Sequence, residues 1–107
     1  MAINIFRNVT ANLTTTGSTL YTAPLGYSGI VLMAQFSNTT AGDVQASMFV
    51  DKSGVLTSLV TDFDIPANDA LGAISGKLVL ESGQAVFASA SANSSVQFTM
   101  SILETEN

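Results

Sequence analysis

The chain has 107 residues, of which 47% are hydrophobic and only 10% are charged, and it contains no histidine, cysteine or tryptophan. The missing histidine and cysteine exclude imidazole acid–base catalysis, cysteine nucleophiles, disulfides, and metal sites built on thiolate or imidazole. Three basic residues against eight acidic ones give a net charge of −5, which disfavours partners such as nucleic acid or an anionic membrane surface.

Hydrophobic and polar side chains alternate along most of the chain, a pattern typical of strands with one face toward a core. Clusters of glycine, proline, asparagine and serine interrupt the alternation at short intervals, and no stretch shows a helical period. The pattern predicts strands near residues 2–10, 18–23, 29–37, 43–51, 55–62, 69–74, 77–80, 84–91 and 95–104. We therefore expect an all-β fold over residues 1–107, a single antiparallel β-sandwich or jelly roll of about 8–9 short strands.

Two short segments carry specific turn predictions. Residues 51–54 are predicted to form a tight turn in which Gly54 has a positive φ. Ser82 and Gly83 turn the chain into a strand rich in alanine and serine, whose small side chains permit close approach of a neighbouring sheet or subunit. Residues 78–80 are expected to form a short buried strand.

The only local cluster of carboxylates is Asp62, Asp64 and Asp69. Calcium binding is one interpretation, since Ca²⁺ prefers oxygen ligands, but the segment lacks a glycine-bearing cation loop and Pro66 interrupts it. Solvated acids at the rim of a sheet are the favoured interpretation. No activated base or perturbed acid suggests itself, so we expect no enzymatic activity, no catalytic residue, no cofactor and no resident metal.

Four hydrophobic side chains are candidates for subunit contacts. Phe49 and Leu103 lie at the outward parity of their strands and are expected to be exposed, whereas Tyr21 and Tyr27 flank a Pro/Gly corner that they either brace or use for binding. A surface so poor in charge is suited to burial between subunits. We therefore expect an oligomer, a trimer or a ring, with contacts at Phe49, Leu103, Tyr21 and Tyr27.

An ordered set of short motifs resembles a known group of proteins. The motifs are residues 19–26 (TLYTAPLG), 76–83 (GKLVLESG), 88–92 (ASASA) and 101–104 (SILE). Together they are similar to small β-sandwich virion proteins of tailed bacteriophages, including many from aquatic hosts, over nearly the whole chain. Relatives often carry an aspartate directly after the second motif, where this chain has Gln84.

The resemblance implies a structural role in a phage particle, and it carries over no catalytic or cofactor residue. A capsid decoration (cement) subunit, which binds other copies of itself and virion proteins such as the major capsid protein, is favoured because the chain is a single compact domain without the long triple-stranded or coiled-coil shaft of a complete fibre. A small tail, fibre or baseplate component is the alternative, and a module that binds a host-surface glycan is a third. The first seven residues do not resemble a signal peptide, so we expect synthesis in the host cytoplasm and a final location in the virion.

Overall fold

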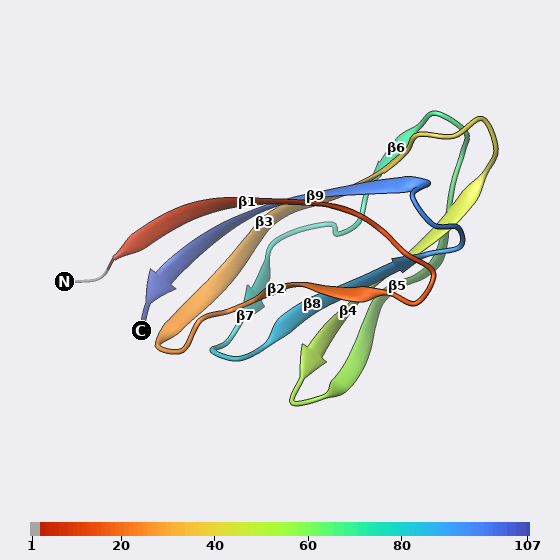
Figure 1. Ribbon diagram of the computed structural model, residues 1–107. Coiled ribbons are helices and arrows are strands. Elements are labelled where there is room, and N and C mark those ends of the chain that lie inside the picture. Colours follow the sequence, from red (N-terminus) through yellow and green to blue (C-terminus); the bar gives the residue numbers. More distant parts are fainter. Residues whose placement is uncertain (1–2) are drawn as a thin grey trace.

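The computed structural model describes residues 3–107, which form nine β-strands and no helix (Figure 1). The predicted strands are all present, with ends that differ by a few residues; the predicted start of the first at Ala2 lies outside the described residues. The strands are β1 (Asn4–Asn12), β2 (Ser18–Thr22), β3 (Tyr27–Asn38), β4 (Val44–Lys52), β5 (Val55–Ile65), β6 (Ala70–Gly72), β7 (Leu78–Leu80), β8 (Ala85–Ala90) and β9 (Val96–Glu106).

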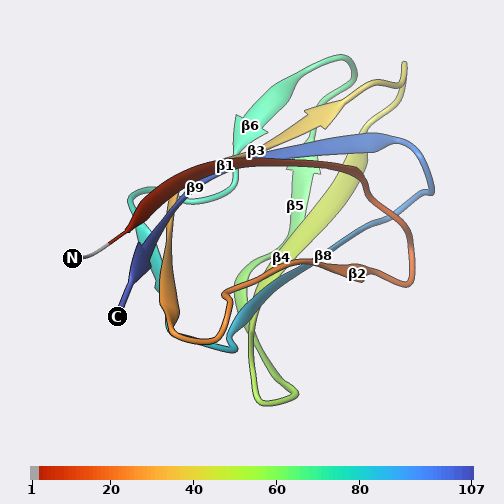
Figure 2. The ribbon, with the colours of Figure 1, turned by 60° about the vertical axis from the view of Figure 1, so that its left-hand side comes forward.

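The strands form two antiparallel sheets packed as two layers, which confirms the predicted all-β sandwich (Figures 1 and 2). In the five-stranded sheet, called the β9 sheet here, the order is β1-β9-β3, and β6 and β7 pair with different stretches of the outer edge of β3. In the four-stranded sheet, called the β4 sheet, the order is β2-β8-β4-β5. The β4–β5 hairpin extends beyond the ends of the neighbouring strands in both views.

The alternating pattern places one face of each central strand in the core. Val96, Phe98, Met100 and Ile102 of β9 have no exposed surface. The ring of Phe98 contacts that of Phe36 on β3 with 5.6 Å between ring centroids. Hydrophobic side chains of β4 and β8 cover this layer from the opposite sheet. Burial of these side chains is the main stabilising contribution to the fold.

Both predicted turns are confirmed. The β4–β5 connection has positive φ at Ser53 (54°) and Gly54 (87°), which is a type I′ hairpin turn, and the Asp51 carboxylate accepts a hydrogen bond from the Gly54 N–H at 2.8 Å. Gly83 also has a positive φ, of 85°, where the chain turns into β8. At these positions glycine avoids the steric penalty of a side chain.

The expectation of a buried strand at residues 78–80 is wrong for Val79, whose side chain is 59% exposed. β7 lies at the edge of the β9 sheet, and Val79 pairs with Ile30 on the outer face while Leu80 points into the core. The strand predicted over 69–74 is shorter, because the chain leaves the edge of β3 after Gly72 and returns only at Leu78.

Candidate functional site

Glu104 is the only charged residue buried within the described part of the chain. Its Oε1 accepts a hydrogen bond from Nε of Arg7 at 2.8 Å, and its Oε2 accepts one from the hydroxyl of Tyr21 at 2.6 Å. Arg7 and Glu104 belong to the β9 sheet, whereas Tyr21 belongs to the β4 sheet. The three side chains, called the Glu104 bridge here, therefore join the two layers.

Gly29 makes room for this bridge. A Cβ atom at Gly29 would lie 3.0 Å from both Cε2 and the hydroxyl oxygen of Tyr21, which is closer than ordinary van der Waals contact. The absence of a side chain on this part of β3 lets the tyrosine ring pass across the gap between the sheets and reach Glu104. Glycine is needed here for space, not for its backbone freedom.

The surroundings of the bridge shift the pKa values of its members. Burial by itself raises the pKa of Glu104, but the hydrogen bonds from Tyr21 and Arg7, together with the Arg7 charge, outweigh burial and lower the pKa overall. Burial, followed by the hydrogen bond to Glu104, raises the pKa of the Tyr21 hydroxyl. Near neutral pH the carboxylate is thus ionised and the hydroxyl protonated.

This arrangement is suited to holding the fold together rather than to catalysis. Both carboxylate oxygens of Glu104 are occupied, and only 2% of its side chain is exposed. A carboxylate with a lowered pKa and no free access to a substrate is a weak general base. The Glu104 bridge is a structural link between the layers.

The four candidate contact residues do not form one patch. Tyr21 is buried in the bridge, and Tyr27 is half-buried at the start of β3. Phe49 and Leu103, expected to be exposed, are half-buried on the outer faces of opposite sheets. Phe49 packs against the ring of Phe87 with 6.1 Å between centroids, which accounts for its partial burial. Their role as subunit contacts stays a prediction.

Leu103 belongs to a row of hydrophobic side chains on the outer face of the β9 sheet. In strand register, Leu103 pairs with Phe6 on one side and with Ile30 on the other, and Ile30 pairs with Val79. The two outer members are the most exposed, Phe6 at 75% and Val79 at 59%. This apolar row crosses four strands, and hydrophobic side chains aligned in this way are typical of a surface that contacts a partner.

The carboxylates considered for calcium are engaged separately. Asp64 accepts a hydrogen bond from the amide of Gln45 at 2.9 Å, and Asp69 accepts one from the backbone N–H of Ala70 at 2.8 Å. Asp62 is exposed at a positive φ of 48°. Within residues 3–107, no three acidic side chains come close enough to hold a metal ion, so the structure gives the calcium alternative no support.

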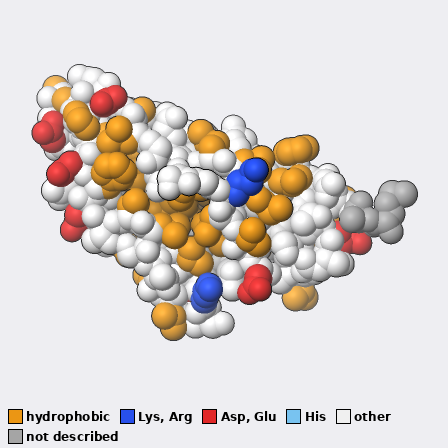
Figure 3. Space-filling model, turned by 180° about the vertical axis from the view of Figure 1, so that it is seen from behind, with side chains coloured by type: hydrophobic (Ala, Val, Ile, Leu, Met, Phe, Trp, Pro, Cys, Tyr) orange, Lys and Arg blue, Asp and Glu red, His pale blue; other side chains and the backbone are white. Residues whose placement is uncertain are grey.

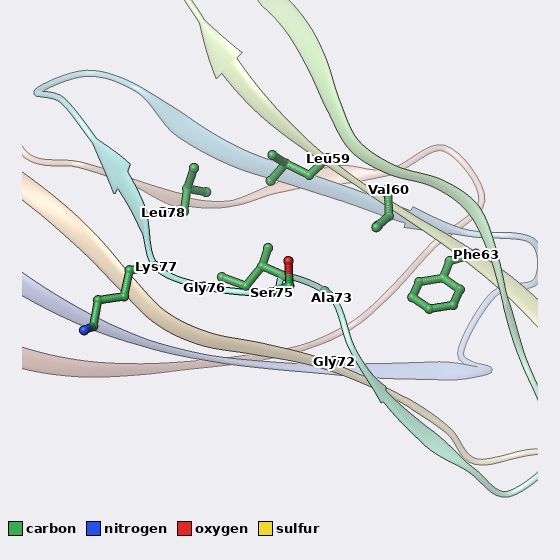
Figure 4. Close-up of a pocket in the computed structure, with 10 residues that line it drawn as sticks. Leu59, Val60, Phe63, Gly72, Ala73, Ser75, Gly76, Lys77 and Leu78 are labelled. Carbon is green, nitrogen blue, oxygen red and sulfur yellow. The ribbon is translucent and has the colours of Figure 1, made fainter.

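A groove of about 460 Å³ lies on the side where β5 faces the segment 72–78. Leu59, Val60 and Phe63 of β5 line one wall, and the segment lines the other (Figure 4). Figure 3 shows hydrophobic side chains gathered over the middle of this side of the molecule. The groove separates the edge of β5 from the β9 sheet, so the sandwich is open along this side.

Sequence reasoning did not identify the Glu104 bridge, although one signal was present. Glu104 has the same parity as Ile102 and the other inward residues of β9, so an acidic side chain at that position was predictable as buried. The partners of Glu104 lie far away in the sequence and come close only through the fold. The exposure of Phe6 was also missed, and it follows from the inward parity of its neighbours Ile5 and Arg7.

Residues 3–107 contain no helix that is long and apolar enough to cross a membrane. No protein-family model matches the chain, and no curated protein matches its sequence.

Two of the solved structures that are similar to this chain show the shared fold. One is from work on Bacillus endospore appendages described as disulfide-linked pili, with a TM-score of 0.59 and 8% identity over 99% of this chain and 88% of that one. The other is from the acid-stable capsid of Helicobacter pylori bacteriophage KHP30, with a TM-score of 0.52 and 10% identity over 98% of this chain and 93% of that one. At these identities the similarity concerns the fold.

Proposed function

We propose that this chain is a bacteriophage virion structural protein, a capsid decoration (cement) subunit that acts through protein–protein contacts and has no enzymatic activity. The observation that carries the proposal is the similarity in fold, over nearly the full length of both chains, to a chain of the KHP30 phage capsid. The motif resemblance at residues 19–26, 76–83 and 101–104 supports the same role. The protein would be made in the host cytoplasm and reside in the virion.

The apolar row on the β9 sheet supports a role based on contacts. Uncharged polar residues lie beside it in register: Asn8 pairs with Ser101 on one side of the row, and Asn4 pairs with Thr105 on the other. A hydrophobic centre with a polar surround is the usual organisation of a protein–protein interface. Because no charged group has to be desolvated at its centre, this face is well suited to rest on another virion protein.

A tail, fibre or baseplate component is the second candidate. The similarity to a pilus chain favours it, since that fold also builds extended assemblies. This chain contains no cysteine, so the disulfide links named for those pili are not open to it. A glycan-binding module has less support, because Phe63 is the only aromatic residue lining the groove.

The copy number of this chain in purified particles tests the proposal. A copy number comparable with that of the major capsid protein supports decoration of the shell, and a much smaller number places the chain in the tail. Absence from purified particles would contradict both virion roles.

A variant of the apolar row tests the contact surface. Phe6→Asp should leave the protein folded by circular dichroism but prevent its attachment to particles that lack it, because the row would then carry a charge that must be desolvated. Asn8→Asp places the same charge on the neighbouring row and is the matched control. Normal attachment of Phe6→Asp would contradict the use of this face.

A further inference from the structure

β5 is a long edge strand of the β4 sheet with no neighbour on its outer side within the described chain. Its first seven residues, 55–61 (VLTSLVT), contain no charge and no proline, and Val55 is 66% exposed, Leu56 45% and Leu59 36%. Natural proteins usually protect such an edge with charged residues, proline or a covering element. Residues 55–58 pair regularly with β4 and lack this protection, whereas the β-bulges of the β4–β5 ladder lie further along, between Ser58 and Val60 and between Val60 and Phe63. The unprotected start of β5 indicates that this part of the edge pairs with another strand when the protein functions.

The other edges differ from β5. β1 carries Arg7 in its middle and asparagine at several positions, and β2 is only five residues long. β6 and β7 have three residues each. β5 is therefore the edge best suited to pair with another strand.

The hairpin turn determines which backbone groups of β5 are free. In a two-residue type I′ hairpin the flanking residues, here Lys52 and Val55, form a hydrogen-bonded pair. Hydrogen-bonded and non-hydrogen-bonded pairs alternate along an antiparallel ladder. Leu56, opposite Asp51, and Ser58, opposite Phe49, therefore point their N–H and C=O groups away from β4.

We propose that β5 is a self-association edge, which pairs antiparallel with β5 of a second copy about a two-fold axis at Thr57. In this register Leu56 of one copy exchanges backbone hydrogen bonds with Ser58 of the other, so the free groups of both strands are satisfied. Val55 of each copy lies opposite Leu59 of the other copy, and the two Thr57 side chains lie opposite each other. Hydrophobic and Thr–Thr cross-strand pairs of this kind stabilise sheets.

Charge also fits this register. The uncharged stretch 55–61 lies at the centre of the contact, and the two copies of Asp62 lie at opposite ends. Each β5 continues toward the hairpin tip of the other copy, which carries Lys52, one of only three basic residues in the chain. Opposite charges thus approach each other at both ends, whereas the parallel arrangement would bring the acidic ends together.

A single pair of strands gives a small interface, so we expect a reversible dimer that forms at high protein concentration. The inference concerns the isolated chain and does not depend on the proposed role in the virion. It is also separate from the trimer or ring expected from the sequence, because a two-fold axis through Thr57 closes after two copies.

The test uses opposite charges at the symmetric position. Sedimentation equilibrium should show a monomer–dimer equilibrium for the unchanged protein. Thr57→Lys and Thr57→Glu should each dimerise about tenfold more weakly, because the substituted side chains face their own copies. An equimolar mixture of the two variants should recover the dimer, since lysine then faces glutamate. Thr10→Lys and Thr10→Glu, on the exposed β1 edge, are the matched controls and should behave like the unchanged protein.

A backbone variant tests the hydrogen-bonding phase independently. Ser58→Pro removes an outward N–H and the hydrogen bond between the Ser58 and Thr61 hydroxyls, but no ladder bond to β4. It should abolish dimerisation while circular dichroism still shows the sheet structure, and Ser58→Ala, which loses only the hydroxyl, should still dimerise. If Ser58→Pro fails to fold, recovery of the dimer in the Lys/Glu mixture still decides the question. The proposal is overturned if the unchanged protein stays monomeric up to millimolar concentration, or if it associates and the mixed Thr57 variants show no recovery over the separate ones.

Discussion

The two long sides of the sandwich are built differently. On the side of β1 and β2, the Glu104 bridge ties the layers together through two hydrogen bonds, one of which, from Arg7, is also an ion pair. On the side of β5 and the segment 72–78, a groove separates the layers and exposed hydrophobic side chains line the edge. The difference indicates that the layers are tied together on one side only, and the open side is where we propose association through β5.

The largest effect is expected from removing the carboxylate of the bridge. Glu104→Ala leaves the buried Tyr21 hydroxyl without its acceptor and opens a space in the core. We expect the free energy of unfolding to fall by about 3 kcal/mol, as measured by chemical denaturation. Glu106→Ala, at an exposed position near the end of the same strand, is the control and should change stability by less than about 0.5 kcal/mol. Equal effects of the two variants would contradict a structural role for the bridge.

A smaller loss is expected from crowding the bridge. Gly29→Ala places a methyl group against the ring and hydroxyl of Tyr21, so the ring must shift away from Glu104. We expect a loss of about 1–3 kcal/mol in the free energy of unfolding. Gly42→Ala is the matched control, because a Cβ there meets no atom within 4 Å. An unchanged stability of Gly29→Ala would show that Tyr21 has room to move.

Acidification should weaken the closed side. Because the pKa of Glu104 is lowered in the folded state, its contribution to stability is present above the unfolded value of about 4.3 and is lost as pH falls through the native pKa. Glu104→Gln removes this titration, so the stability difference between the unchanged protein and the variant should narrow below about pH 4. Thermal unfolding at several pH values measures this difference in stability, with Glu106→Gln as the control. A stability difference that stays constant as the pH falls would contradict a lowered pKa of Glu104 in the folded protein.

The smallest effect on stability is expected on the open side. Leu59 is 36% exposed at the edge of the groove, so Leu59→Ala should cost less than about 1 kcal/mol. Leu80→Ala removes the same atoms from a fully buried position and should cost about 2–5 kcal/mol. Similar losses for the two variants would show that the open side contributes more to the core than its exposure indicates.

The sequence by itself determined the strands, the turns and the sandwich class. Alternating parity identifies which face of a strand is buried because successive side chains point to opposite sides, and this is a local property of the chain. The tight turn over residues 51–54 is equally local, since glycine at position 54 adopts a positive φ without a steric penalty. Its type I′ geometry, with a positive φ at Ser53 as well, was seen only in the structure. Parity also marks Glu104 as inward, but it does not identify the partners of the carboxylate.

Only the tertiary structure decided which distant side chains meet and which strands lie at an edge. Glu104 and Arg7 are 97 residues apart in the chain, and they become partners because β1 pairs with β9. The exposure of Val79 and the openness of β5 follow from their places at the edges of the sheets. Strand order depends on long-range packing of the whole chain and leaves no trace in the pattern of any one segment, so the closed side, the open side and the β5 edge appear only in the folded molecule.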